Sequence, residues 1–404
     1  MAQAHRAVLA AASLACLLGA CVQPTNSAPE HDADAAVATE SGATIWRFDS
    51  RSSNSGLVVD GSGNIFFGGT RFSATTDATN LILSRYSPDG QELWTRTFTS
   101  TKLSWIVQLA LGPDGTVGVG GFFEGTVDFG GQQRTDQGMG DAFVAFYTPG
   151  GDLKSVTTFG GLAFDNVAAV AADPSGDWFI GGQALGITIA GTALDGPFVA
   201  RLDPQGVPRW ARAGGGFATV VSGSSIYAGS PGLPPQISRL RAADGVADWS
   251  DTLGDSVRVF RAALDGSGQR LVIGGDFQGS LTLNGRTFTG AGLEDVFIAG
   301  LDSATGKVLW GEQLLGSQGS DQTTAVCADA SGHAYVGGSY SGSVPPRLGE
   351  PGSSSQAFVA KYTLDGTRVW LHFVPDGNTV SSLYCDSPRG ILVGFTGGFL
   401  RMVP

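Results

Sequence analysis

The stretch SGATIW, from Ser41 to Trp46, contains the spacing Gly-x-x-x-Trp that decides the fold of this 404-residue chain. The spacing returns as GQELW, GVPRW, GVADW, GKVLW and GTRVW, which end at Trp94, Trp210, Trp249, Trp310 and Trp370. A copy that begins at Gly151 has Ser155 in place of the tryptophan. Successive copies begin 39 to 61 residues apart, so the chain is built of repeats.

A second signature alternates with the first: a tight turn with Asp or Gly, a short β-rich run and, in strong copies, paired glycines. Strong copies begin at Asp60, Gly112, Asp173, Asp265 and Asp329, and weaker copies at Val221 and Asp386. A third run, such as AFVAKY from Ala357, leads through another turn into the tryptophan segment. Each unit is therefore expected to contain four strands, and there are seven units.

The seven units predict an all-β fold, a seven-bladed β-propeller of four-stranded antiparallel blades that spans residues 41–404. One such sheet cannot bury both faces, whereas sheets packed radially about an axis can. Helical repeats are excluded because the units lack a 3.6-residue period and glycine interrupts them every few residues. The last unit ends at Pro404 without a tryptophan segment. Residues Ala43 to Asp49 are expected to supply its outer strand and close the ring.

The tryptophans occupy one position per unit, on the expected outer strand. We expect them to pack against the neighbouring blade, each burying about 150 to 250 Å². Ligand binding is the alternative that we weigh against this role.

Residues 1–20 have the features of a lipoprotein signal peptide. An apolar run follows Arg6, is too short to span a membrane comfortably, and ends in LGAC. This ending resembles the lipobox of bacterial lipoproteins and predicts acylation of Cys21; ordinary cleavage after Ala20 is the alternative. Residues 21–40 are small and polar and predict a flexible tether. By resemblance to bacterial sorting rules, Val22 favours an outer-membrane lipoprotein that faces the periplasm or the cell surface.

The charge balance limits the partners. Lys and Arg number 24 against 36 Asp and Glu, which gives a net charge of −12. Such a surface repels phosphate backbones, so we expect no nucleic-acid partner. We expect a monomer attached to the membrane through its lipid.

The units resemble the bacterial β-propeller repeats (SBBP-like) of secreted and surface proteins. The resemblance rests on DAFVAFYTPGGDLKSVTTFGG, Asp141 to Gly161, and on AFVAKYTLDGTRVW, Ala357 to Trp370, and extends over nearly everything after Gly42. It implies a propeller but no particular function, because propellers host unrelated activities.

LDSATGKVLW, Leu301 to Trp310, also resembles the tryptophan-docking repeat of quinoprotein propellers and of a lipoprotein scaffold for outer-membrane β-barrel assembly. The quinone-binding members of that group typically have eight blades and an adjacent cysteine pair. This chain has seven expected blades and no such pair, so we expect no quinone cofactor.

Residues for catalysis are scarce. His5 and His31 precede the expected propeller, and His333 and His372 fall at non-equivalent positions of consecutive units. Two histidines at non-equivalent positions are too few for a multi-histidine metal site and make a Ser-His-Asp triad a poor hypothesis. SPDGQELW from Ser87 resembles the sialidase Asp-box, but its glycine comes one place early, so we interpret it as a turn.

Acidic residues recur where the outer strand of one unit connects to the inner strand of the next: Asp165, Asp255, Asp321 and Asp376. These connectors lie on one face of a propeller. The four carboxylates could form an acidic rim suited to Ca²⁺ or a cationic ligand. Solvated turn residues are the alternative, and we predict no other cofactor.

Cys327 and Cys385 occupy equivalent positions, just before the turn Asp of adjacent units. A disulfide and two buried thiols are the alternatives. We favour thiols, because equivalent Cα atoms on neighbouring blades are expected to exceed the roughly 7 Å limit for a disulfide.

These observations favour a non-catalytic envelope lipoprotein whose propeller binds a protein or a glycan. The rival hypothesis is a propeller enzyme, either a quinone-dependent oxidoreductase or a carbohydrate-active enzyme.

Overall fold

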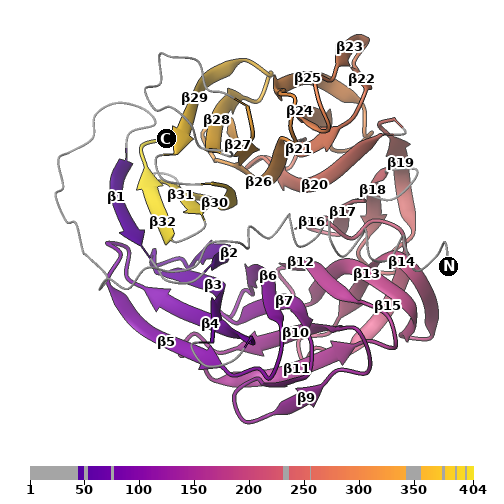
Figure 1. Cartoon of the computed structure of the whole chain (residues 1–404). Coiled ribbons are helices and arrows are strands. Elements are labelled where there is room, and N and C mark those ends of the chain that lie inside the picture. Colours follow the sequence, from indigo (N-terminus) through magenta and orange to yellow (C-terminus); the bar gives the residue numbers. More distant parts are fainter. Residues whose placement is uncertain are drawn as a thin grey trace.

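The computed structural model describes residues 44–49, 53–73, 77–230, 236–254, 256–342, 356–374, 378–386, 389–395 and 398–404. Seven four-stranded antiparallel sheets stand in a ring around a central axis (Figure 1). This confirms the predicted seven-bladed propeller. No helix in the described part is long and apolar enough to cross a membrane. The predicted signal peptide, Cys21 and the tether lie outside the described residues.

Each of the first six blades takes four consecutive long strands, numbered from the axis outward. Blade 1 holds β2 (Ser53–Val59), β3 (Ile65–Phe72), β4 (Thr79–Tyr86) and β5 (Glu92–Phe98); blade 2 holds β6 (Ser104–Leu111), β7 (Val117–Phe123), β10 (Asp141–Tyr147) and β11 (Leu153–Phe159). Blade 3 holds β12 (Asn166–Ala172), β13 (Trp178–Ile189), β14 (Thr192–Leu202) and β15 (Pro208–Ala213); blade 4 holds β16 (Ala218–Ser222), β17 (Ser225–Gly229), β18 (Gln236–Arg241) and β19 (Ala247–Thr252). Blade 5 holds β20 (Val257–Leu264), β21 (Arg270–Phe277), β24 (Asp295–Asp302) and β25 (Val308–Leu315); blade 6 holds β26 (Gln322–Ala328), β27 (His333–Tyr340), β28 (Gln356–Thr363) and β29 (Arg368–Val374). Two small hairpins, β8 (Thr126–Asp128) with β9 (Gln133–Thr135) and β22 (Ser280–Leu283) with β23 (Arg286–Thr289), join the second and third strands of blades 2 and 5.

The seventh blade joins the two ends of the described chain. Its inner strands are β30 (Val380–Asp386), β31 (Gly390–Phe395) and β32 (Gly398–Met402), and its outer strand is β1 (Thr44–Asp49). β1 runs antiparallel to β32, with Thr44 opposite Met402 and Asp49 opposite Gly398. The predicted closure of the ring by the N-terminal strand is confirmed.

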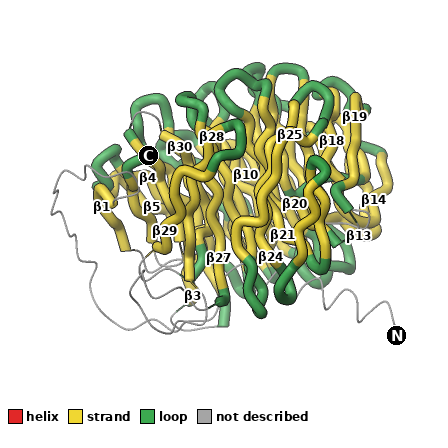
Figure 2. Tube along the Cα trace, turned by 90° about the horizontal axis from the view of Figure 1, so that it is seen from above, coloured by secondary structure: helices red, strands yellow, loops and turns green. Residues whose placement is uncertain are grey.

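The strands run between two layers of loops (Figure 2). One layer contains the turns between first and second strands and between third and fourth strands; we call it the turn face. The other contains the connectors between blades and the loops between second and third strands; we call it the connector face. On the turn face Asp173 Oδ1 accepts hydrogen bonds from the backbone N–H groups of Ser175 and Asp177, at 2.9 and 3.0 Å. Gly176 follows Ser175 at a φ of 91°, which favours glycine, so the predicted turn signature is confirmed here.

The second strand has paired glycines because the innermost strand next to it contains a β-bulge. The register of this strand shifts by one residue in every blade except the fourth. The bulge brings a carbonyl oxygen over the second glycine: a Cβ atom on Gly121, Gly182, Gly275 or Gly338 would lie 1.8 to 2.0 Å from that oxygen. The first glycine lets the next blade approach, since a Cβ on Gly120 would lie 2.5 Å from the Val170 side chain.

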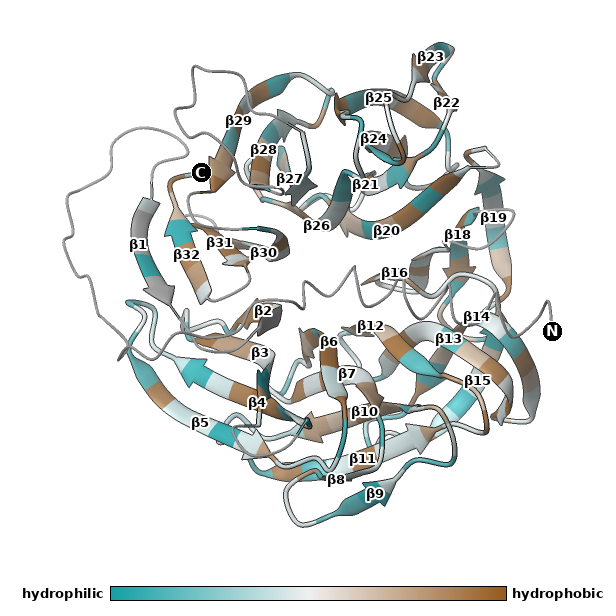
Figure 3. Cartoon of the chain, viewed as in Figure 1, coloured by the Kyte–Doolittle hydropathy of each residue, from teal (hydrophilic) through white to brown (hydrophobic). Residues whose placement is uncertain are grey.

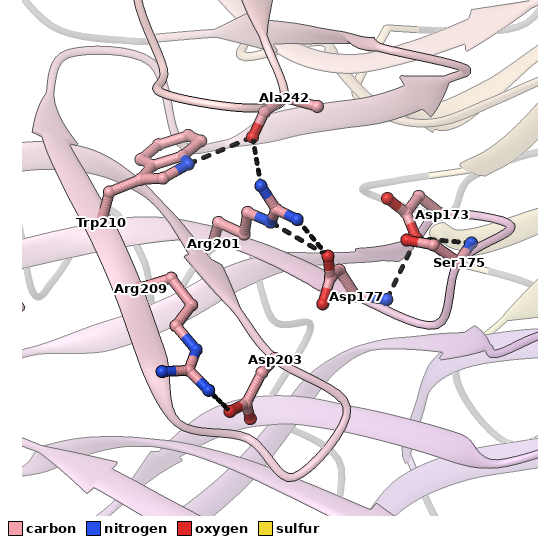
Figure 4. Close-up of polar contacts among 8 residues, drawn as sticks. All are labelled: Asp173, Ser175, Asp177, Arg201, Asp203, Arg209, Trp210 and Ala242. Atoms are coloured by element: carbon pink, nitrogen blue, oxygen red, sulfur yellow. Dashed lines mark hydrogen bonds and ion pairs between the residues drawn. The ribbon is translucent and has the colours of Figure 1, made fainter.

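The tryptophans of blades 1, 3, 4 and 5 pack against the next blade, as predicted. The ring of Trp210 lies on Gly245, the glycine of the next Gly-x-x-x-Trp segment, and its Nε1–H donates to the Ala242 carbonyl at 3.1 Å (Figure 4). Trp310 repeats the arrangement with Gly366 and donates to the Leu364 carbonyl at 2.9 Å. The glycine and the tryptophan of the motif are therefore two halves of one contact between blades.

Blade 2 lacks the motif tryptophan, and Phe146 of β10 together with Trp178 of β13 in blade 3 provides the packing at this contact. Phe146 approaches Gly206 in the next blade, and Trp178 packs against Phe146 with ring centroids 4.8 Å apart. Trp178 is 2% exposed. Ser155, at the tryptophan position, donates to the Gln205 carbonyl at 3.0 Å.

The hydrophobic core lies between the blades. Middle strands are buried on both faces, so every residue of β10 is buried, whereas hydrophobic and hydrophilic bands alternate along the outer strand β5 (Figure 3). One cluster joins Phe66 and Leu83 of blade 1 to Val119 and Phe143 of blade 2. Radial packing thus buries both faces of each sheet, as the repeat analysis required.

The preference for free thiols was wrong. Cys327 on β26 and Cys385 on β30 form a disulfide with Cα atoms 5.8 Å apart. Both residues lie on innermost strands, where neighbouring blades come closest to the axis and to each other. Equivalent positions there fall within bridging distance.

Candidate functional site: the connector face

The connector face carries several exposed apolar side chains. Five of the nine large hydrophobic residues that are exposed in the described chain lie there, 41% to 86% exposed: Phe72, Leu103, Met139, Leu162 and Leu293. The other four, Leu93, Val207, Val246 and Val369, lie in or beside Gly-x-x-x-Trp segments at the start of outer strands. Exposed apolar side chains on loops in contact with each other, as at Met139 and Leu162, are a feature of binding surfaces.

Backbone hydrogen bonds hold the connectors against the loops. The N–H of Glu124, after β7, donates to the Leu103 carbonyl at 2.7 Å. The connector after β11 lies so close to the loop before β10 that a Cβ on Gly138 would meet Leu162 Cα at 2.6 Å. Over blades 1 to 3 the apolar residues are therefore carried on loops that support one another.

Asp165 and Asp321, two residues of the predicted acidic rim, lie on the connector face but are fully buried. Asp165 Oδ1 accepts a hydrogen bond from the N–H of Leu185 at 2.7 Å. Asp321 Oδ1 accepts from the N–H of Ser341 at 2.8 Å and from the hydroxyl of Ser317 at 3.0 Å. Asp255 and Asp376 lie outside the described residues. Cation binding by these four residues stays a prediction.

Two further carboxylates that the sequence analysis missed lie beside Asp165 and Asp321. Asp141 begins β10 and Asp295 begins β24, and they are 2% and 0% exposed. A Cβ on Gly160, in the connector that carries Asp165, would lie 2.1 Å from the Asp141 carboxylate; Gly316 relates to Asp295 in the same way at 2.3 Å. We call Asp141 with Asp165 the 2–3 pair, and Asp295 with Asp321 the 5–6 pair, after the blades that they join.

Burial raises the pKa of three of these carboxyls. The pKa of Asp165 rises to about 6, through burial and the nearby charge of Asp141. The pKa values of Asp141 and Asp295 are raised mainly by burial. Such shifts mean that the protein around the pairs disfavours their negative charge.

A pocket lies on the turn face where blade 2 lacks its tryptophan. Its volume is about 400 Å³, and Ser155, Trp178 and Pro204 are among the residues that line it. At its edge Lys154 pairs with Asp114 at 3.0 Å.

The two histidines within the described residues lie on β27 and β29. His333 lies 3.4 Å from the Asp329 carboxylate in a turn, and His372 lies against Trp370 on β29. The Ser87 run forms the expected turn, in which Ser87 Oγ accepts a hydrogen bond from the N–H of Gln91 at 3.0 Å. Within the described ranges, no three His, Cys, Asp or Glu residues are placed to share a metal ion.

Comparison with known proteins supports the fold. No family model and no curated protein matches the sequence. A chain of the Mitotic Checkpoint Complex is similar with a TM-score of 0.58 and 12% identity over 95% of this chain and 99% of that one. The β-propeller domain of Cps50 (Swd1) from Myceliophteria thermophila gives 0.53 and 10% over 89% and 98%. Sqt1 from Saccharomyces cerevisiae gives 0.52 and 10% over 90% and 100%. At these identities the likeness extends to the fold alone.

Proposed function

We propose that the chain is a non-catalytic, membrane-tethered scaffold of the cell envelope that binds a protein partner through its connector face. The observation that carries the proposal is the set of five exposed apolar side chains on that face. Exposed apolar residues on neighbouring loops of a rigid scaffold suit the core of a protein–protein contact.

Charge suggests the chemistry of the partner. Glu124 and Asp136 belong to the same connector-face loops as Met139, and the whole chain has a net charge of −12. A complementary partner has an apolar centre and a basic edge, which would speed its association at low salt. One structural neighbour is itself a chain of a multiprotein complex, which agrees with a scaffold role.

Capture from solubilised envelopes after cross-linking tests the connector face. The double variant Met139→Glu with Leu162→Glu places charge in the apolar set, and we expect it to lower partner recovery at least about tenfold, because a hot-spot change costs roughly 2 kcal/mol. The matched control is Val207→Glu with Val369→Glu, at exposed residues outside the connector face. Equal recovery with both double variants would refute the assignment of this face.

Tethering is tested separately at Cys21. Because acyl chains anchor through burial in the bilayer, Cys21→Ser is expected to move the protein from the membrane fraction to the soluble fraction. A variant that stays in the membrane fraction at the wild-type level would contradict the lipoprotein hypothesis and leave the binding face untouched.

A glycan is the second candidate ligand, favoured by the pocket beside Ser155. Its polar edge and apolar wall suit a sugar ring. Oligosaccharide binding that Lys154→Ala weakens, while the connector-face variant does not, would favour this candidate.

A further inference from the structure

The two buried carboxylate pairs repeat one arrangement at two places in the ring. The N–H of Asp165 donates to the Gly140 carbonyl at 3.0 Å, and the N–H of Asp321 donates to the Glu294 carbonyl at 2.9 Å. In both cases the acceptor directly precedes the Asp that opens the third strand. The two sites therefore share this backbone hydrogen bond and the same two Asp positions.

The propeller does not need acids at these positions. By strand register, the junction between blades 1 and 2 has Asn80 and Ser104 at the two positions, and the junction between blades 6 and 7 has Gln356 and Asn378. Neutral residues therefore occupy these register positions in two other junctions. The acids at the 2–3 and 5–6 pairs thus call for an explanation beyond the fold.

Within the described ranges, no basic side chain neutralises the pairs. The four carboxylates are 0% to 2% exposed, and in the described part of the chain none of them forms an ion pair with Lys, Arg or His. Burying two neighbouring negative charges without a counter-charge is strongly unfavourable. A proton or a bound cation must therefore compensate each pair when the protein is folded.

Each pair also has an oxygen that no hydrogen bond satisfies. Asp165 Oδ2, Asp295 Oδ1 and Asp321 Oδ2 are buried and have no hydrogen-bond partner among the residues that the structure describes. The unsatisfied oxygen of Asp295 faces the connector of Asp321, because a Cβ on Gly316 would lie 2.3 Å from it. Buried carboxylate oxygens without donors are free to act as ligands.

We infer that each pair binds one Ca²⁺ ion, between a third-strand Asp and the connector Asp of the next blade. Ca²⁺ accepts six to eight oxygen ligands in flexible geometry and takes backbone carbonyls and water beside carboxylates. Two carboxylates per ion fit this behaviour. A site of two carboxylates without His or Cys does not suit metals that prefer softer ligands.

The ions would stiffen the loops that carry part of the exposed apolar set. The 2–3 pair fastens the loop of Met139 to the connector of Leu162, and the 5–6 pair fastens the loop of Leu293. Stiffening of these loops is the only link between the inferred Ca²⁺ sites and the proposed protein-binding function. Ca²⁺ binding itself can be measured on the free protein, so the two can fail separately.

Calorimetric titration of Ca²⁺ into the purified, EGTA-treated full chain tests the inference. We expect two ions per chain with dissociation constants at or below about 1 mM, and a melting temperature that rises with added Ca²⁺. Asp321→Asn should leave one ion, and Asp165→Asn with Asp321→Asn should leave none. The matched control is Asp251→Asn, an exposed carboxylate on β19, which should keep both ions.

Two outcomes would overturn the inference, and the first needs no variant. One is the absence of both heat and a melting shift at 10-fold the expected dissociation constant, with ionic strength held constant by NaCl. In that case, stabilisation of the metal-free protein on acidification would assign a shared proton to the pairs. The other is unchanged stoichiometry in a folded double variant, which would place the ions elsewhere on this acidic surface.

Discussion

Trp310 shows how single residues hold neighbouring blades together. Its ring lies on Gly366 and its Nε1–H donates to the Leu364 carbonyl. Trp310→Ala removes both contacts and opens a gap between blades 5 and 6, so we expect the free energy of unfolding to fall by about 2 to 3 kcal/mol. Urea titration measures the loss.

The ring supplies its own control for this prediction. Ser155 occupies the same position in blade 2, where Phe146 and Trp178 have taken over the packing. Ser155→Ala should therefore change stability by less than about 1 kcal/mol. Equal losses in the two variants would mean that the contact of Trp310 with Gly366 adds nothing to the stability.

The disulfide between Cys327 and Cys385 is the second prediction at this scale. It closes a loop across blades 6 and 7, with the two cysteines 58 residues apart in sequence. A loop of this length predicts about 4 kcal/mol from chain entropy, and measured effects commonly fall between about 2 and 4 kcal/mol. Cys327→Ala with Cys385→Ala should lower the free energy of unfolding by that amount. Wild-type protein with the disulfide reduced should have the same free energy of unfolding as the variant. If oxidised wild-type protein and the variant unfold together, the bond does not stabilise the ring.

At the scale of the strand, the bulge in the inner strand requires a glycine at the facing position of the second strand. A Cβ on Gly338 would lie 1.8 Å from the Gln322 carbonyl oxygen, so Gly338→Ala must push β26 away from β27. We expect a loss of at least about 3 kcal/mol or a failure to fold. Gly61→Ala, which meets nothing within 4 Å, is the matched control. Circular dichroism melts of the two variants distinguish this steric effect from the general effect of replacing a glycine by alanine.

The strands and turns could be predicted from the sequence because their signals are local. Asp173 and Gly176 mark a turn by their own chemistry, and the tryptophan spacing marks the outer strand. The pairing of Cys327 with Cys385 could not be predicted, because it depends on how closely two inner strands approach at the axis. Local spacing does not encode that distance, whereas the ring sets it.

The candidate site was predicted in part for the same reason. Asp165 and Asp321 stand out as recurrent connector acids, but Asp141 and Asp295 look like ordinary first residues of the third strand. Their partnership appears only when the strand register places them beside the connectors. The signal available in the sequence was the coincidence of an Asp at both positions of the same junction, in two junctions.

For the whole molecule, closure by β1 is the feature most open to test. Deleting residues 41–50 removes all of β1 and leaves β32 as an exposed edge. We expect a melting temperature at least about 5 °C lower and a tendency to aggregate, since several kcal/mol of strand packing are lost. Deleting residues 22–38 should leave the melt unchanged. A 41–50 deletion that melts like the intact protein would show that the ring does not depend on β1.

The position of β1 also determines how the molecule responds to mechanical force. A pull on the chain before Thr44 reaches β1 first, and the antiparallel pairing of β1 with β32 opposes it. A chain held at its N-terminus would therefore bear tension at its closing blade, and the first event under load would be release of the ring.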